Sequence, residues 1–303
     1  MENQFSKIIL GTVQLGMPYG VGRWANELMP EAEAFRILDA AWEMGITTLD
    51  TSPDYGLAEM RLAKYMKANP AKCFHIISKI KNIPLEIESV RPCIGNWFED
   101  SPFHLLDNCR SLSLLLHREA DIYRDEVVKQ LNIEVKTKRL SCWGASVYQE
   151  DSARVASTIE TCAMVQLPFN AFNQAFGRNG VIELLSNRGK TVMARSVFLQ
   201  GLLLQSRNRL HELGERNAGI AEKLFFSLRR QNASVHEFAM SVALAEAGIN
   251  NLVLGVDTHE QLIAWNVIPN PLDKFDLPAS LLDELRHHDS QKLNPQHWKK
   301  HAD

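Results

Sequence analysis

The sequence predicts an α/β protein built as a (β/α)8 TIM barrel. Two observations favour this fold: short apolar runs alternate with segments of helical periodicity, and the 303 residues hold eight such runs, the number that closes a barrel. Each run is apolar on both faces, as is typical of parallel strands covered by helices. An open, doubly wound sheet is the alternative. It normally carries a G-x-G-x-x-G motif, whereas this chain reads Gly11-Thr-Val-Gln-Leu-Gly16, with a different spacing.

The eight predicted strands are, in chain order, Lys7–Gly11, Thr47–Asp50, Phe74–Lys79, Ser113–His117, Leu140–Gly144, Met164–Pro168, Thr191–Arg195 and Asn251–Gly255. Two of the helices between them have clear boundaries. Glu31–Met44 has apolar residues at spacings of three and four, follows Pro30 and ends before Gly45. Ser234–Ala247 opens with a serine and a glutamate three positions later, which predicts a capping box.

Two segments interrupt the eightfold rhythm. Leu202–Ala233 is a charged insertion after the seventh run, and Pro269–Asp303 is a tail with its own helix signal over Leu281–His288. The chain has no internal repeat, low-complexity tract or linker. We therefore expect residues 1–303 to form a single domain, with the barrel over about 7–268 and a C-terminal helical tail over 269–303.

Composition excludes charge-driven binding as the first hypothesis. The chain is 45% hydrophobic and 23% charged, which is ordinary for a globular protein, and 33 Lys and Arg against 36 Asp and Glu give a net charge of −3. No basic field favours nucleic acid or an anionic membrane surface. No apolar run reaches the ~18–20 residues of a membrane span. We therefore expect neither a nucleic-acid nor a membrane partner.

The N-terminus and the cysteines predict a cytoplasmic protein. Met1–Lys7 lacks the basic-then-apolar order of a secretion signal. The cysteines are odd in number and widely scattered, and no pair has the C-x₂₋₄-C spacing of a zinc or redox motif. We expect reduced thiols and no bound metal. The five positions are Cys73, Cys93, Cys109, Cys142 and Cys162.

Polar residues gather where the predicted strands end, which is where barrels of this class carry their chemistry. Taken singly, the first of them have structural interpretations. Lys79 would extend to water, His117 would be a hydrogen-bonded structural residue, Asp50 would cap the next helix, and Tyr55 would be a loop aromatic. The strand-end positions are Asp50, Lys79, His117, Ser146, Gln166, Arg195, Ser196 and Gly255.

Together the same residues could reduce a carbonyl group. Hydride addition to a carbonyl needs an acid to protonate the developing alkoxide. A tyrosine with an ordinary pKa of ~10 becomes a useful acid–base group when a neighbouring cation lowers that pKa. Lys79 is the candidate cation for Tyr55, and Asp50 would stabilise the positive charge of Lys79 and orient its side chain. His117 would donate a hydrogen bond to the substrate oxygen.

The pattern resembles the aldo/keto reductase superfamily. Asp50-Thr-Ser-Pro-Asp-Tyr-Gly56, followed by Glu59, is similar to the family's D-T-x-x-x-Y-G-x-x-E signature, and Lys79 and His117 stand at the next two strand ends. The resemblance covers about residues 7–266. It implies an NAD(P)H-dependent reductase of aldehydes or ketones. Its catalytic tetrad would be Asp50, Tyr55, Lys79 and His117.

The resemblance also implies a cofactor site built without a Rossmann glycine motif. The matching segments read like bacterial members found with surface-polysaccharide and sugar-nucleotide biosynthesis, which implies a sugar-like carbonyl substrate. The cofactor contacts would be Gly11, Thr12, Ser146, Gln166, Arg195, Ser196, Phe198, Gln200, Gly255, Asp257 and Gln261.

Three positions depart from the family pattern. Arg195 stands where many members stack a tyrosine on the nicotinamide. A guanidinium also stacks on rings, but its charge disfavours the cationic oxidised cofactor, so we predict tighter binding of the reduced form, unless Arg195 pairs with a carboxylate. Val147 replaces an asparagine that contacts the carboxamide. Asp257 lies in a loop that carries no lysine or arginine for a 2′-phosphate, which favours NADH, whereas family precedent favours NADPH. Both cofactors stay open.

Substrate contacts are less well defined. Trp24, Trp97 and Phe169 belong to segments near the predicted barrel mouth and either line a substrate pocket or pack in the core. Arg23 and Arg178 either meet an anionic substrate group or are solvated surface charges.

The leading hypothesis is an enzyme that reduces a small-molecule carbonyl. A second hypothesis is a cofactor-sensing regulatory partner protein on the same scaffold, with little turnover. A third is a Schiff-base aldolase with Lys79 as the imine nucleophile. The oligomeric state stays open.

Overall fold

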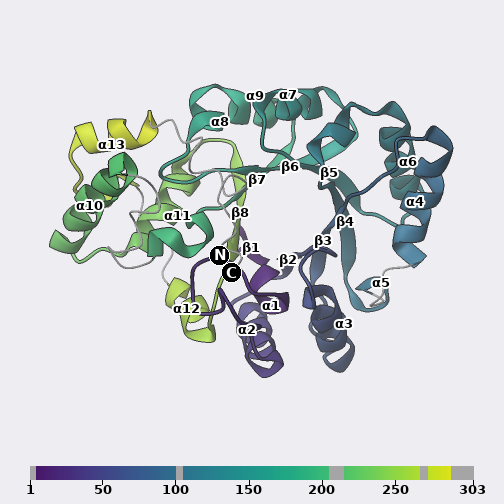
Figure 1. Cartoon of the computed structure of the whole chain (residues 1–303), viewed down its shortest axis with the longest axis horizontal. Helices are drawn as coiled ribbons and strands as arrows, with labels where there is room; N and C mark the ends of the chain where they lie inside the picture. The colour runs from purple at the N-terminus through teal and green to yellow at the C-terminus, as the bar shows by residue number, and fades with distance from the viewer. Residues whose placement is uncertain (1–4, 100–104, 205–214, 267–271, 288–303) are drawn as a thin grey trace.

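The computed structural model describes residues 5–99, 105–204, 215–266 and 272–287, and its eight parallel strands close into a barrel in chain order, β1 to β8 (Figure 1). The predicted fold class is therefore confirmed. The strands are β1 (Ile8–Gly11), β2 (Thr48–Asp50), β3 (His75–Ile80), β4 (Ser111–Leu116), β5 (Cys142–Ser146), β6 (Cys162–Pro168), β7 (Thr191–Arg195) and β8 (Ile249–Gly255).

Helices surround the barrel (Figure 1). The α-helices are α1 (Val13–Gly16), α2 (Glu31–Glu43), α3 (Ala58–Ala68), α4 (Ile87–Glu99), α5 (Leu105–Asn108), α6 (Asp125–Lys136), α7 (Glu150–Thr158), α8 (Ala175–Arg178), α9 (Val181–Asn187), α10 (Glu215–Arg230), α11 (Val235–Ala245), α12 (His259–Ile263) and α13 (Ala279–Arg286). Short 3₁₀ helices are η1 (Glu119–Tyr123), η2 (Leu199–Leu204), η4 (Ala264–Asn266) and η5 (Leu272–Lys274).

The predicted helix signals have the expected local causes. Pro30 is the residue before the first turn of α2. Ser234 and Glu237 form the capping box of α11, in which Ser234 Oγ accepts from the Glu237 amide at 3.1 Å and the Glu237 carboxylate accepts from the Ser234 amide at 3.1 Å. Such a cap stabilises a helix by about 1 kcal/mol.

Strand register brings the polar ends to one rim. Gly11 pairs with Asp50 on one side and Gly255 on the other, which closes the barrel between β1 and β8. Ser146 pairs with Gln166. Because all eight strands are parallel, their carboxyl ends share the same opening.

An apolar layer fills the barrel beneath that rim. Ile9, Ile77, Leu115, Met164 and Met193 form a cluster of their own, separate from the larger core between strands and helices. Side chains two positions apart on a strand point to the same face, so the residue two positions after each of these also faces the barrel interior. Those later residues are Gly11, Lys79, His117, Gln166 and Arg195, all of which line the pocket described below.

The insertion and the tail form helices beside β7 and β8. The charged insertion contains α10, and its side chain Lys223 pairs with Glu284 of α13 at 3.1 Å. Figure 1 shows α10, α11 and α13 on the same side of the barrel. The predicted tail helix begins two residues earlier than expected, at Ala279, and ends at Arg286. The rest of the tail beyond His287 lies outside the described residues.

No helix in the described ranges combines the length and the apolar character that a membrane crossing requires. In the same ranges, no three His, Cys, Asp or Glu side chains come together as a metal site.

Candidate active site

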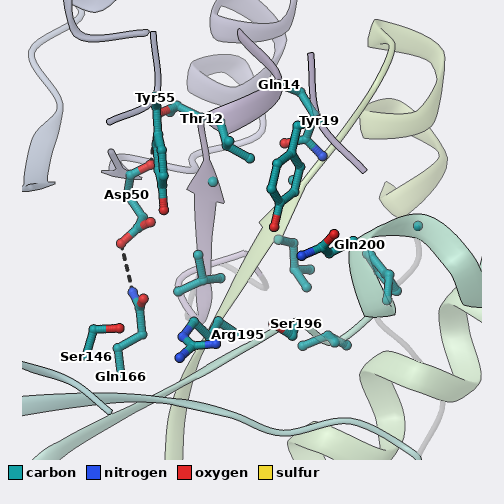
Figure 2. A pocket seen from close by; sticks show the side chains of 18 of the residues that line it. Thr12, Gln14, Tyr19, Asp50, Tyr55, Ser146, Gln166, Arg195, Ser196 and Gln200 are labelled. Atoms are coloured by element: carbon teal, nitrogen blue, oxygen red, sulfur yellow. Dashed lines mark hydrogen bonds between the residues drawn. The ribbon is translucent and has the colours of Figure 1, made fainter. Parts of the chain in front are cut away.

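A pocket of about 1010 Å³, open solvent included, lies at the carboxyl ends of the strands. All four residues of the predicted tetrad and all eleven predicted cofactor residues line it. Figure 2 labels several of them, among them Asp50, Tyr55, Gln166 and Arg195. The structure thus brings these fifteen residues together, and their individual roles stay predictions.

A buried ion pair stands at the centre of one wall. Lys79 Nζ donates to Asp50 Oδ1 at 2.7 Å and to the Thr51 carbonyl at 2.8 Å, and the two charged side chains are 2% and 4% exposed. Gln166 Nε2 donates to the other carboxylate oxygen of Asp50 at 2.8 Å (Figure 2). Asp50 is therefore not a helix cap; it holds Lys79.

The ion pair keeps the Lys79 amine protonated. Burial, the largest single effect, lowers the pKa of this ammonium group, but the charge of Asp50, the neighbouring Tyr55 and the hydrogen bonds to both together outweigh it, so the pKa lies above its ordinary value. An imine nucleophile has to be a neutral amine. The geometry therefore argues against Lys79 as a Schiff-base lysine.

Tyr55 lies over the lysine, with Lys79 Nζ 4.8 Å from the centre of its ring. Burial raises the pKa of the Tyr55 hydroxyl, Lys79 lowers it and Asp50 raises it, so that the net pKa is above the ordinary value. The prediction that Lys79 brings this pKa down captures one contribution but not the sum, because burial is the larger effect. At neutral pH Tyr55 therefore carries its proton.

Close approach of two loops fixes Tyr55 in this position. The Leu57 amide donates to the Gly16 carbonyl at 2.9 Å, and a Cβ at Gly16 would lie 2.0 Å from the Tyr55 carbonyl oxygen. Only glycine fits there. Glu59, the last residue of the motif, is not among the residues that line the pocket, and it accepts from Ser78 Oγ at 2.6 Å, which ties α3 to β3.

His117 follows β4 directly, and its amide donates to the Ile80 carbonyl at 2.8 Å. Its Nδ1 lies 3.3 Å from Asp54 Oδ2. Burial lowers the pKa of the imidazole, and the positive charge of Lys79 lowers it further. At neutral pH the pocket therefore holds a neutral histidine beside a charged lysine.

Arg195 is held by a ring and a carbonyl. Its guanidinium carbon lies 3.9 Å from the centre of the Tyr148 ring, and Nη2 donates to the Val147 carbonyl at 3.1 Å. Within the described ranges no carboxylate forms an ion pair with Arg195. The alternative in which Arg195 is neutralised by a carboxylate is therefore not what the structure has.

The β8 loop is braced from the N-terminal side of the chain. The Trp24 indole donates to the Asp257 carbonyl at 2.5 Å, and the Arg23 amide lies 3.3 Å from Asp257 Oδ2. The Asp257 amide donates to Gln261 Oε1 at 2.7 Å. A Cβ at Gly22 would lie 1.7 Å from the Asp257 carboxylate, so the two loops are in direct contact. Burial raises the pKa of the Asp257 carboxyl.

The basic side chains that line the described pocket are Lys79 and Arg195, and neither belongs to the Asp257 loop. Arg36 reaches this loop from α2, but its guanidinium is 2.9 Å from Glu33 and 3.3 Å from Glu260. Among the described residues that line the pocket, the end near Asp257 therefore offers a carboxylate and no lysine or arginine, while Arg23, whose amide contacts Asp257, has its guanidinium over the Trp24 ring.

The three aromatic residues predicted for the substrate do not line the pocket. Trp24 braces the β8 loop, Trp97 packs edge-to-face on Phe98 within α4, and Phe169 is fully buried in the core. The packing interpretation describes all three. Arg178 Nη1 donates to the Arg286 carbonyl at 2.9 Å, and the Arg23 guanidinium stacks on Trp24 at 5.0 Å, so both serve as structural contacts.

Among the pocket residues that the sequence did not predict, three carry polar side chains. Tyr19 lies in the loop after α1, and its hydroxyl points to the same side of the pocket as that of Tyr55 (Figure 2). Burial and the neighbouring Tyr55 raise the pKa of Tyr19. Tyr148 and Gln14 also line the pocket. Strand-end reasoning misses all three, because each follows a strand by two or more residues.

Two features of the pocket fit a bound dinucleotide. The Gln14 side-chain oxygen is buried and has no hydrogen-bond partner among the described residues, which leaves an acceptor for a ligand. Ser196, Leu199 and Gln200 have positive φ angles of 61°, 49° and 54° in the loop after β7. Non-glycine residues in this conformation concentrate where a fold presents its backbone to a ligand.

Comparison with known proteins gives consistent results. The sequence profile of the Aldo/keto reductase family matches residues 7–274. A D-threo-aldose 1-dehydrogenase from Pseudomonas sp is 31% identical over 96 residues, and the chain spans 29% of the length of this curated relative, using 30% of its own.

Two solved structures have the same fold. An aldo-keto reductase from Bacillus halodurans in its holo form is 20% identical, with a TM-score of 0.72 and 94% of each chain covered. A putative aldo-keto reductase from Pseudomonas aeruginosa is 18% identical, with a TM-score of 0.60, covering 87% of this chain and 88% of the other.

Proposed function

This chain belongs to the aldo/keto reductase family, and we propose that it reduces an aldehyde or ketone to an alcohol with NADH or NADPH. One observation carries the proposal: the buried Lys79–Asp50 pair lies directly beside the ring of a protonated tyrosine. That arrangement supplies a proton donor and a fixed cation at the same point, which is what a developing alkoxide requires.

The dinucleotide supplies a hydride to the carbonyl carbon when it is bound. The chain's own residues do the rest. Tyr55 gives its hydroxyl proton to the carbonyl oxygen, and the phenolate that remains is stabilised by the Lys79 cation. Asp50 holds Lys79 in place from the far side. In its charged form His117 would donate a hydrogen bond that orients the carbonyl. Tyr55 regains its proton from water.

The pocket residues assigned to the cofactor divide by position. Ser146 and Gln166 would hold the carboxamide, Arg195 would face the nicotinamide ring, and the 196–201 loop would hold the pyrophosphate. The positive charge of Arg195 is not offset by a carboxylate, because its partners among the described residues are a carbonyl and a ring. This charge disfavours the cationic oxidised form, so the reduced cofactor should bind more tightly.

The Asp257 end of the pocket favours NADH. A buried carboxylate near the adenosine ribose accepts hydrogen bonds from a free 2′-hydroxyl and repels a 2′-phosphate. Arg36, which reaches the same loop, is already paired with Glu33 and Glu260. NADPH remains the choice that family precedent favours, and the two are separated by the titration below.

A sugar-derived carbonyl compound is the proposed substrate class. The resemblance to bacterial members found with surface-polysaccharide biosynthesis supports it. So does the relative named as a D-threo-aldose dehydrogenase. The five free cysteines are in keeping with a cytoplasmic location, which we also propose.

The test is a fluorescence titration of the purified protein with NADH and NADPH in parallel, followed by a screen of aldoses and simple aldehydes by loss of cofactor absorbance. We expect micromolar binding of at least one reduced cofactor and turnover with a carbonyl compound. Binding of neither cofactor would refute the proposal. Binding without oxidation by any carbonyl would favour the regulatory alternative.

A further inference from the structure

We propose that Asp54 is a positioning residue for His117: it fixes the imidazole with Nδ1 toward the Asp54 carboxylate and Nε2 toward the pocket. Lys81 reduces the effect of the negative charge of Asp54. The inference rests on the proposed function insofar as His117 is a catalytic residue. Its physical content, the state of the His117 ring, is independent of turnover.

The three side chains come from three consecutive strand ends. Asp54 directly precedes Tyr55 in the loop after β2, Lys81 follows β3, and His117 follows β4. The Asp54 carboxylate is divided between two partners: Oδ2 lies 3.3 Å from His117 Nδ1, and Oδ1 pairs with Lys81 Nζ. The backbone also constrains Asp54, because its amide donates to Ser52 Oγ at 3.2 Å.

The cluster stands at the rim of the pocket, between water and the buried ion pair. The Asp54 and His117 side chains are 29% and 30% exposed and Lys81 is 46% exposed, whereas Lys79 is 2% exposed. His117 lines the pocket and the other two do not. The contact therefore acts on the substrate site through the histidine.

A carboxylate beside Nδ1 decides which nitrogen carries the proton. It favours a proton on Nδ1, since a bare nitrogen lone pair facing a carboxylate is repelled. In the neutral ring Nε2 then has no hydrogen and only accepts. Donation from Nε2 to a carbonyl oxygen therefore requires the imidazolium, in which both nitrogens carry hydrogens.

Charges from several elements compete over that imidazolium. Burial opposes it most, and Lys79 of β3 and Arg195 of β7 oppose it as well. Asp54 and Asp50 of the β2 region favour it, Asp54 more than Asp50. Lys81 pairs with the other carboxylate oxygen of Asp54 and thereby reduces the effect of Asp54 on the ring. Asp54 is thus the main group that keeps the charged donor form accessible.

The experiment is a proton titration of ¹⁵N-histidine-labelled protein by NMR, without cofactor. His117 is assigned by comparison with His117→Asn. We expect the neutral ring of the native protein to carry its proton on Nδ1. In Asp54→Ala we expect the Nε2–H form to appear and the His117 pKa to fall by about half a unit to one unit.

Two further variants separate charge from hydrogen bonding. Asp54→Asn retains an acceptor for Nδ1–H but no charge, so the proton should stay on Nδ1 while the pKa falls. Lys81→Met removes the competing cation and should raise the His117 pKa. Asp283→Asn is the matched control, because Asp283 of α13 lies 3.0 Å from Nδ1 of His287, which follows that helix, and its loss should leave the His117 signals unchanged.

A native His117 with its neutral proton on Nε2 would overturn the inference, and so would a His117 pKa that is the same in native, Asp54→Asn and Lys81→Met proteins. Should Asp54→Ala not fold, the latter two variants decide the matter.

Kinetics give a second readout. The alkaline limb of the kcat profile for carbonyl reduction should move to lower pH in Asp54→Asn and return in Asp54→Glu, which a purely structural role would not produce. An inactive protein whose His117 shifts as expected would refute the proposed function but support the positioning role.

Discussion

Replacing Lys79 with methionine tests the energetics of the buried ion pair. Methionine retains most of the side-chain length, so the change mainly removes the charge and leaves the Asp50 carboxylate with Gln166 as its remaining side-chain donor. The carboxylate is 4% exposed, so water cannot replace the lost partner. Breaking a buried pair in this way costs about 3–5 kcal/mol. For a chain of 303 residues this corresponds to a fall in melting temperature of about 5–8 °C.

The assay is urea unfolding followed by circular dichroism, carried out for Lys79→Met, Asp50→Asn and the double variant. The double variant should cost about 2–3 kcal/mol less than the sum of the single ones, because no unpaired charge is left. Lys64→Met is the surface control: Lys64 pairs with Glu31 at 2.5 Å but is 59% exposed, so its loss should cost less than about 1 kcal/mol. Equal costs for Lys79→Met and Lys64→Met, or additive costs in the double variant, would refute this account of the pair.

Four shorter predictions concern the pocket and the thiols. Tyr55→Phe should lower kcat by about 10²–10⁴-fold with an unchanged cofactor Kd, and turnover within threefold of the parent would show that another group is the acid. Asp257→Ser should move the ratio of NADPH to NADH affinity toward NADPH by about tenfold, measured by fluorescence titration; an unchanged ratio would place the ribose elsewhere. Arg195→Leu should reduce the preference for reduced over oxidised cofactor, and equal affinities of the native protein for both forms would contradict the reasoning. Cys162 is fully buried, and burial raises the pKa of its thiol to about 12. Iodoacetamide at pH 8 should therefore leave Cys162 unmodified in the folded protein, as checked by mass spectrometry. Labelling without denaturant would count against the fold around β6.

Periodicity predicted the strands well where apolar runs and strands coincide. Thr191–Arg195 has the predicted bounds of β7. The predicted run Leu140–Gly144 begins and ends two residues before β5, because the Leu140 amide still donates to the Glu134 carbonyl in the last turn of α6. A helix end and a strand start can share one apolar run, and sequence alone does not divide it.

Helices in charged segments were harder to predict. α10 lies in the insertion that stood out only for its charge, yet its apolar side chains Ile220, Leu224 and Leu228 are buried. That residues 1–303 form one domain stays a prediction.

The candidate site was predictable as a set of strand-end residues, because the barrel itself brings strand ends together. Side-chain direction was not predictable from position along the chain. Trp24 turns toward the β8 loop and Phe169 into the core, whereas Tyr148 turns toward Arg195. The net direction of the Tyr55 pKa likewise depends on burial, which only the three-dimensional structure reveals.

The apolar layer inside the barrel closes the lower end of the pocket, so the pocket opens at one end. Ile9, Ile77, Leu115, Met164 and Met193 are at most 8% exposed and seal the end opposite the mouth. In a reductase that works as proposed, substrate, product and the water that returns a proton to Tyr55 all share that mouth. Tyr55 can then regain its proton only after the product has left. Product release and reprotonation of Tyr55 then occur one after the other through the same opening. Higher solvent viscosity, which slows product release, would therefore slow reprotonation as well.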